Sequence, residues 1–89
     1  MAFVEIYTKM GCGYCTAAIH LLNEKHVEFD EIDVTMGGAA RKAMLDRAPN
    51  HRTTPSIFID RKHIGGYDDL SALDRAGQLD DLLKLSATG

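Results

Sequence analysis

The chain has few cysteines, no long hydrophobic run and no excess of basic residues, and each absence excludes a class of protein. Two cysteines in 89 residues are too few for a secreted scaffold held by several disulfides. No apolar run approaches the ~18 residues that a membrane span needs. Ten basic against 13 acidic side chains give a net charge of −3, which argues against nucleic-acid binding because that requires a basic face. We therefore expect neither a membrane protein nor a nucleic-acid-binding protein.

The amino-terminal segment also lacks the features of a secretory signal. Met1-Ala2-Phe3-Val4-Glu5 has no basic region followed by an apolar stretch, so we expect a cytoplasmic protein. The composition, 45% hydrophobic and 26% charged, is typical of a globular chain, and 89 residues leave little room for a second core. Because no linker, repeat or low-complexity segment divides the sequence, we expect one domain over residues 1–89.

The first strand is predicted by alternation of side chains. In residues 2–7, Val4 and Ile6 lie on one face, and Phe3 and Tyr7 lie on the other. Both faces carry apolar residues, which is typical of a central strand that is covered on both sides.

The spacing of apolar residues and the positions of glycine and proline predict the other elements. Helices are predicted over residues 14–25, 39–48 and 68–76, strands over 27–34, 56–60 and 63–65, and a last helix around Leu79, Leu82, Leu83 and Leu85. The apolar phase of the second strand slips between Phe29 and Ile32, which indicates a bulge or an early strand end. Asp60-Arg61-Lys62 has the length of a tight hairpin connection. The order β-α-β-α-β-β-α-α predicts an α/β fold, with helices on both faces of a four-stranded mixed sheet.

Cys12-Gly13-Tyr14-Cys15 stands where the first strand has ended and the first helix begins. Unpaired N–H groups and the positive end of the helix dipole stabilise a thiolate there, so we expect a lowered pKa for Cys12. Lys9 adds a positive charge in the preceding loop. Cys15 lies inside the first turn and should be more shielded, within disulfide reach of Cys12. The pattern predicts a reactive dithiol, with Cys12 as nucleophile and Cys15 as resolving thiol.

The same cysteine spacing has two alternative interpretations, half of a zinc site or a pair of inert buried thiols. A zinc site needs a second pair of ligands, but the chain has no further cysteine, and its histidines stand at no ligand spacing from the pair. We therefore expect no metal in the main role of this site. The four histidines are His20, His26, His51 and His63.

Two other segments carry binding features. Thr53-Thr54-Pro55 precedes an apolar strand, and a cis Thr54–Pro55 bond would turn the backbone of Thr54 toward an extended substrate. In Gly65-Gly66-Tyr67-Asp68-Asp69, Asp68 at a helix start would accept the ammonium group of a ligand, and nearby N–H groups would bind its carboxylate. Taken alone, the two segments favour an ordinary trans proline and a plain helix cap.

Together these segments resemble the glutaredoxin family, which has a thioredoxin-like fold. The resemblance covers nearly the whole chain, through residues 4–9, 12–15, 53–60 and 63–70. It implies a single glutaredoxin domain that acts as a glutathione-dependent thiol–disulfide oxidoreductase on protein–glutathione mixed disulfides and protein disulfides. It also implies a monomer, with glutathione as reducing co-substrate and glutathionylated or disulfide-containing proteins as clients.

The resemblance further implies how glutathione is bound. The cysteinyl part pairs with the backbone of Thr54 beside a cis Pro55, and the γ-glutamyl end meets backbone N–H groups and the carboxylate of Asp68. Lys9 and Arg52 face the glycyl carboxylate. The other implied contact residues are Tyr14, which walls the groove beside the nucleophile, and Thr53, Gly66 and Tyr67.

Three positions depart from the family pattern. Gly13 stands where the family most often has proline. Glycine loosens the turn, so we expect the redox potential and the cysteine pKa to change. Thr54 replaces valine, and since its implied role is a backbone one we expect little effect. Tyr67 replaces a small residue and is expected to narrow the glutathione site.

Two alternative functions remain open at this point. The first is an iron–sulfur cluster carrier, in which Cys12 of each of two subunits and two glutathione thiols hold the cluster. Gly13 makes the active-site loop flexible enough for such a cluster. A Cys15 thiol that can form a disulfide with Cys12 argues against this function. The second is a redoxin reduced by a flavoprotein reductase, which would not need the clamp at residues 66–68.

Overall fold

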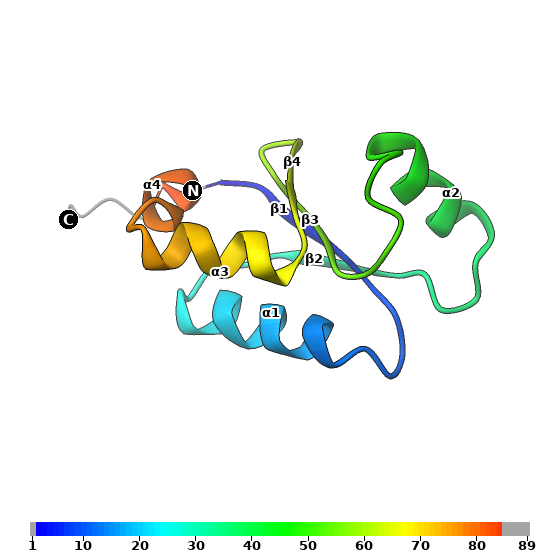
Figure 1. The fold of residues 1–89 in the computed structure, drawn as a ribbon, viewed down its shortest axis with the longest axis horizontal. Coiled ribbons are helices and arrows are strands. Elements are labelled where there is room, and N and C mark those ends of the chain that lie inside the picture. The colour runs from blue at the N-terminus through cyan, green and yellow to red at the C-terminus, as the bar shows by residue number, and fades with distance from the viewer. Residues whose placement is uncertain (1, 85–89) are drawn as a thin grey trace.

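The computed structural model describes residues 2–84, which form one mixed sheet and four helices (Figure 1). The sheet has the order β2-β1-β3-β4, in which β1 is parallel to β2 and antiparallel to β3, and β3 is antiparallel to β4. The predicted element order and sheet type are confirmed. The elements are β1 (Val4–Thr8), α1 (Gly13–Glu24), β2 (Asp30–Asp33), α2 (Gly38–Arg47), β3 (Ser56–Ile59), β4 (Lys62–Gly65), α3 (Tyr67–Arg75) and α4 (Leu79–Leu83).

The sheet is covered on both faces, as the alternation in the first strand predicts. Val4 and Ile6 of β1 belong to the larger buried cluster, together with residues of α1, α3 and α4. Tyr7 of β1 and Phe58 of β3 point to the other face and pack against Met44 of α2. Burying a Leu, Ile or Phe side chain fully contributes about 1.5–3 kcal/mol. Figure 1 shows α1 and α3 side by side, with α2 at the other end of the molecule.

The second strand is shorter than the sequence predicts. It begins at Asp30 instead of residue 27, and no bulge occurs within it. Val27 is 7% exposed and packs with the larger cluster, so this apolar segment serves the core before the chain joins the sheet. The register irregularity of the sheet lies elsewhere, between Ile57 and Phe58.

The predicted tight hairpin is present between β3 and β4. Asp60 and Arg61 both have positive φ, 51° and 69°, which is the backbone conformation of a two-residue hairpin turn. The Asp60 carboxylate accepts a hydrogen bond from the Phe3 N–H at 2.9 Å and pairs with Lys84 at 3.0 Å. These contacts attach the hairpin to the start of β1 and to the end of α4. Leu85, predicted on the last helix, lies outside the described residues.

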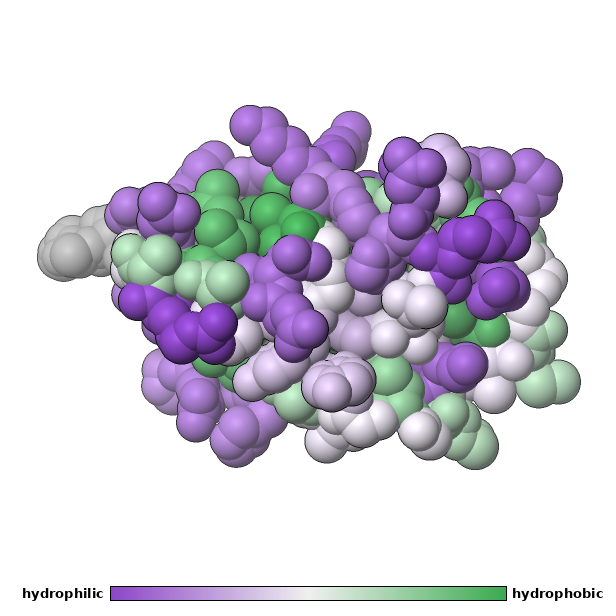
Figure 2. Space-filling model, in the orientation of Figure 1, coloured by the Kyte–Doolittle hydropathy of each residue, from purple (hydrophilic) through white to green (hydrophobic). Residues whose placement is uncertain are grey.

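The surface mixes polar and apolar side chains. In Figure 2 hydrophilic side chains cover much of the visible face, and hydrophobic ones show through beside α3 and α4. Within residues 2–84, no helix combines the length and apolar character that crossing a membrane requires.

Candidate active site

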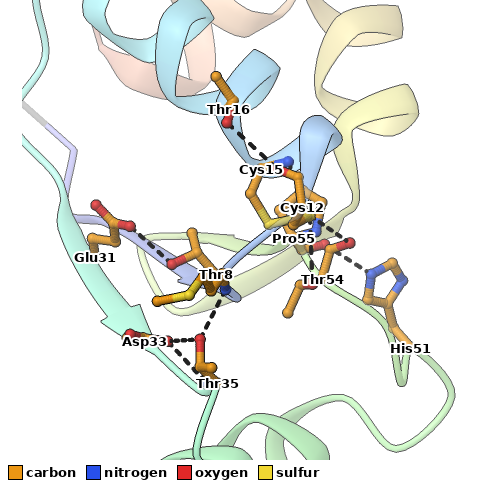
Figure 3. The surroundings of a disulfide bond; sticks show 11 residues. Thr8, Cys12, Cys15, Thr16, Glu31, Asp33, Thr35, His51, Thr54 and Pro55 are labelled. Atoms are coloured by element: carbon orange, nitrogen blue, oxygen red, sulfur yellow. Dashed lines mark hydrogen bonds between the residues drawn. A yellow bond between two sulfur atoms is a disulfide. The ribbon is translucent and has the colours of Figure 1, made fainter.

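Cys12 and Cys15 are joined by a disulfide at the start of α1, as their spacing predicts (Figure 3). Their Cα atoms are 5.2 Å apart, within the ordinary range for a disulfide. Cys12 is the N-cap of the helix, and its sulfur accepts a hydrogen bond from the Cys15 N–H at 3.1 Å. Cys15 is 3% exposed, whereas Cys12 is half-buried. An attacking sulfur from solvent therefore meets Cys12 first.

The loop before Cys12 is anchored to the chain that follows β2. The Met10 N–H donates to the Thr35 hydroxyl at 2.8 Å, and that hydroxyl bonds in turn to the Asp33 carboxylate. Gly11 has a φ of 75°, which favours glycine because side chains with a Cβ rarely adopt it. These contacts place the first sulfur at the end of the sheet.

The Thr54–Pro55 peptide bond is cis and lies beside the disulfide (Figure 3). The Thr54 carbonyl oxygen is 3.6 Å from the Cys12 sulfur, and the Thr54 hydroxyl donates to the same sulfur at 3.5 Å. The expectation of a cis bond is thus met. The hydroxyl contact was missed by the sequence analysis, which considered only the backbone of Thr54, since no local pattern reports where this side chain points.

A groove of about 190 Å³ runs from this loop to the start of α3. It brings together all the expected glutathione contacts except Lys9 and Arg52, and it adds two residues that sequence reasoning missed. The lining residues are Tyr14, His51, Thr53, Thr54, Pro55, Gly66, Tyr67, Asp68 and Asp69.

The first turn of α3 forms one end of the groove. The helix begins at Tyr67 with Gly66 as its N-cap, so Asp68 is its second residue and not the cap. Asp69 is the third residue of the helix, and its carboxylate accepts the N–H of the N-cap residue Gly66 at 3.0 Å. Gly65 has a φ of 124°, and a Cβ there would collide with this carboxylate. N–H groups in a first helical turn have no partner within the helix, so those of Tyr67 and Asp68 are suited to an anionic ligand.

Two of the side chains that line the groove are aromatic and contact each other. The rings of Tyr14 and Tyr67 stack with their centroids 6.1 Å apart and an angle of 23° between their planes. Tyr14 is 65% exposed, so the stack stands at the surface and links the first turn of α1 to that of α3. That Tyr67 narrows a glutathione site stays a prediction.

His51 also lines the groove. Its Nε2 donates to the Pro55 carbonyl oxygen at 3.0 Å, and its ring would stand 3.3 Å from a Cβ at Gly66. The histidine therefore packs between the proline loop and the start of α3. It was missed because isolated histidines carry no spacing signal.

Neither Lys9 nor Arg52 lines this groove. Lys9 lines a hollow on the other side of the disulfide, with Met10, Cys15 and Glu31. Arg52 is exposed and lines neither the groove nor this hollow. Their contact with the glycyl carboxylate of glutathione stays a prediction. Over residues 2–84, no three His, Cys, Asp or Glu side chains are grouped so as to hold a metal ion.

The site defines a class of protein. A sulfur at a helix start that forms a reversible bond to its neighbour exchanges disulfides with other thiols. On a mixed sheet with helices on both faces, this is the arrangement of a thioredoxin-like dithiol–disulfide oxidoreductase.

Comparison with known proteins defines the family. The glutaredoxin family model matches residues 4–64. Glutaredoxin 3 of Escherichia coli (strain K12) is 52% identical over 84 residues, which cover 94% of this chain and 100% of that protein. The chain belongs to the glutaredoxin family, whose members are glutathione-dependent thiol–disulfide oxidoreductases.

Solved structures agree with this assignment. The solution structure of glutaredoxin from Brucella melitensis matches with a TM-score of 0.80 and 48% identity, over 94% of this chain and 90% of that one. The crystal structure of a buckwheat glutaredoxin–glutathione complex matches with a TM-score of 0.81 and 27% identity, over 94% of this chain and 78% of that one.

Proposed function

We propose that this glutaredoxin reduces protein–glutathione mixed disulfides through Cys12 alone and protein disulfides through Cys12 and Cys15 together, with glutathione as reductant. The observation that carries this proposal is the disulfide at the start of a helix between the half-buried residue Cys12 and the buried residue Cys15, which is 3% exposed. Only an accessible sulfur can attack a client, and only a neighbouring sulfur within bonding reach can displace that client afterwards.

The first reaction needs one cysteine. The Cys12 thiolate attacks the glutathione sulfur of a glutathionylated client, so a Cys12–glutathione bond forms and the client leaves as a thiolate that takes up a proton. The thiolate of a second glutathione then attacks the glutathione sulfur bound to Cys12. Glutathione disulfide is released and Cys12 departs as a thiolate.

The second reaction uses both cysteines. Cys12 attacks a client disulfide and forms a mixed disulfide, and the Cys15 thiolate then attacks the Cys12 sulfur and expels the reduced client. The product is the Cys12–Cys15 disulfide that the structure contains. Two glutathione molecules return it to the dithiol and leave as glutathione disulfide.

The groove supplies the glutathione site in this proposal. Thr54 and Pro55 line it beside the Cys12 sulfur, and the first turn of α3 offers N–H groups and the Asp68 carboxylate to the γ-glutamyl end. The buckwheat protein of similar fold is a complex with glutathione, which supports the same ligand here. Tyr14, Thr53, Gly66 and Tyr67 complete the wall, while Lys9 and Arg52 are proposed for the glycyl carboxylate.

We further propose that residues 1–89 form one glutaredoxin domain that acts as a cytoplasmic monomer on glutathionylated or disulfide-containing proteins. The family match ends at residue 64, but Leu70 of α3 and Leu79 and Leu83 of α4 are fully buried in the same cluster as β1. This shared core supports a single unit.

A pair of variants tests the division of roles. In an assay with glutathione and glutathione reductase, Cys12→Ser should abolish the reduction of both a glutathionylated peptide and a protein disulfide. Cys15→Ser should keep most of the first activity and lose the second. If both activities vanish together in Cys15→Ser, the proposed division of roles is wrong.

The two alternative functions have their own readouts. A redoxin that depends on a flavoprotein reductase would not turn over with glutathione and glutathione reductase. An iron–sulfur carrier would purify anaerobically as a brown dimer with visible absorption that requires glutathione.

A further inference from the structure

The Thr54 side chain gives the Cys12 sulfur a second hydrogen-bond donor. The Thr54 hydroxyl lies 3.5 Å from this sulfur, and the Cys15 N–H lies 3.1 Å from it. The two donors come from residues that are 42 and 3 positions away in the chain. They meet only because β3 starts beside the beginning of α1.

These two donors act differently on the oxidised and reduced protein. A disulfide sulfur is uncharged and accepts hydrogen bonds weakly. A Cys12 thiolate carries a full negative charge, so the same two donors then make charge-assisted hydrogen bonds, which are shorter and stronger. The hydroxyl therefore stabilises the reduced, ionised form more than the disulfide.

Thr54 also offers a partner to the neutral thiol. Its carbonyl oxygen is 3.6 Å from the Cys12 sulfur, close enough to accept a bond from an S–H group. The hydroxyl serves the thiolate and the carbonyl serves the thiol, so replacing only the side chain removes the partner of the charged form. Valine has nearly the shape of threonine without the donor, and it keeps the carbonyl.

We propose that the hydroxyl of Thr54 is a catalytic group that stabilises the Cys12 thiolate, biases the protein toward its dithiol form and speeds the release of Cys12 from mixed disulfides. The proposal rests on the proposed role of Cys12 as nucleophile. When a glutathione thiolate attacks the glutathione sulfur bound to Cys12, that sulfur–sulfur bond breaks and its electron pair moves to Cys12. The Thr54 hydroxyl donates to the charge that develops there.

The effect on attack should be smaller than the effect on release. A more stabilised thiolate is more abundant at neutral pH but intrinsically less nucleophilic, and the two changes offset each other. When Cys12 is instead the leaving thiolate, its stabilisation speeds the release, and no loss of nucleophilicity opposes this gain. The regeneration of Cys12 by glutathione should therefore respond to Thr54 more than the attack on the client does.

Three variants test the proposal in the full chain. Thr54→Val removes the hydroxyl, and Thr54→Ser keeps it. Thr16→Val is the matched control, because the Thr16 hydroxyl is equally close to the site but bonds to the Cys12 carbonyl oxygen at 3.4 Å instead of the sulfur. The readouts are the pH dependence of Cys12 alkylation in the reduced protein and the dithiol–disulfide equilibrium in glutathione buffers.

In Thr54→Val, we expect the alkylation midpoint to move to higher pH and the equilibrium to shift toward the disulfide by about tenfold, the size expected for one hydrogen bond to a charged acceptor. For this two-electron couple, that shift lowers the reduction potential by about 30 mV. Thr54→Ser and Thr16→Val should stay near the wild type in both measurements.

Two results would overturn the proposal. One is a Thr54→Val protein with the midpoint and equilibrium of the wild type, and the other is a Thr16→Val protein that shifts as far as Thr54→Val. Either result leaves the Cys12→Ser test untouched, because that variant loses the nucleophile itself. A Cys12→Ser protein that stays active would instead refute the proposed function.

Discussion

The polar groups between α2 and the sheet differ from those around the groove, because they form hydrogen bonds with one another. Arg47 of α2 donates to both carboxylate oxygens of Glu5, at 2.9 and 3.0 Å, and to the Tyr7 hydroxyl at 3.0 Å. Its guanidinium carbon lies 3.9 Å above the ring of Phe58. The bond to Glu5 is also the main reason why the pKa of Arg47 is raised. Arg47, Glu5, Tyr7 and Phe58 form what we call the Arg47 cluster.

The groove is organised in the opposite way. Asp68 is exposed, and the N–H groups that begin α3 point to no partner within the helix. The Cys12 sulfur accepts two hydrogen bonds, which become strong only when the sulfur is ionised. The polar groups of the Arg47 cluster bond to one another, so we expect changes there to alter stability. The groove is the proposed glutathione site, so we expect changes there to alter activity. Three pairs of variants, each a test variant with its control, examine this contrast.

The largest effect is expected in the Arg47 cluster. Arg47→Ala leaves the Glu5 carboxylate without its partner and should lower the free energy of unfolding by about 2 kcal/mol in urea denaturation. Its matched control is Lys42→Ala on the same helix, whose exposed ion pair with Asp46 is screened by solvent and should contribute little to the free energy of unfolding. Both variants should keep wild-type turnover at 25 °C. A folded Arg47→Ala protein with poor turnover would break the contrast.

An intermediate effect is expected at the groove. Asp68→Ala removes the carboxylate proposed for the ammonium group of glutathione, and it should raise the KM for glutathione by about tenfold, as for one lost charged hydrogen bond. Asp81→Ala makes the same change in the first turn of α4 and should leave KM unchanged. An unaltered KM in Asp68→Ala would show that the Asp68 carboxylate does not hold glutathione.

The smallest effect concerns His63, which lies between the two regions. Burial is the main cause that lowers its pKa, followed by the neighbouring charge of His51 and opposed by Asp69. Its Nε2 lies 3.1 Å from the Ser56 hydroxyl oxygen. The folded protein binds a proton on His63 less readily than the unfolded protein does. The stability that neutral His63 contributes to the fold is therefore present above pH 6.5, the ordinary pKa of histidine. It is lost as the pH falls through the lowered pKa.

Thermal unfolding between pH 7.5 and pH 5 measures this contribution. The Tm of His63→Gln should fall less steeply with acidification than the Tm of the wild type, by a few degrees at most. His20→Gln, which changes an exposed histidine on α1, should follow the wild-type curve. Parallel curves for His63→Gln and the wild type would exclude His63 as an acid-sensitive group.

The sequence predicted the parts of this protein that depend on neighbouring residues. The alternation of Val4, Ile6 and Tyr7 assigned side chains to the correct faces of the sheet. The spacing of Cys12 and Cys15 predicted their disulfide. Such features follow from the two-residue repeat of a strand or from the geometry of one helical turn, so a few neighbouring residues are enough to predict them.

Features that depend on how the chain turns between elements were harder to predict. The start of β2 was placed three residues too early, because Val27 is as apolar as a strand residue but packs in the core before the sheet begins. Asp68 was expected to cap α3, but the helix starts at Tyr67, so Gly66 is the N-cap and the Asp69 carboxylate accepts its N–H. His51 gave no signal in the sequence at all.

By itself the sequence determined the element order, the strand faces, the family and the reactive pair, because short-range spacing and residue type carry that information. Tertiary structure alone decided which distant side chains meet, such as Thr54 with Cys12 and Arg47 with Glu5, both 42 positions apart. The reason is that a side chain's direction at the end of a loop is set by the packing of the elements that the loop connects, and no local pattern records that packing.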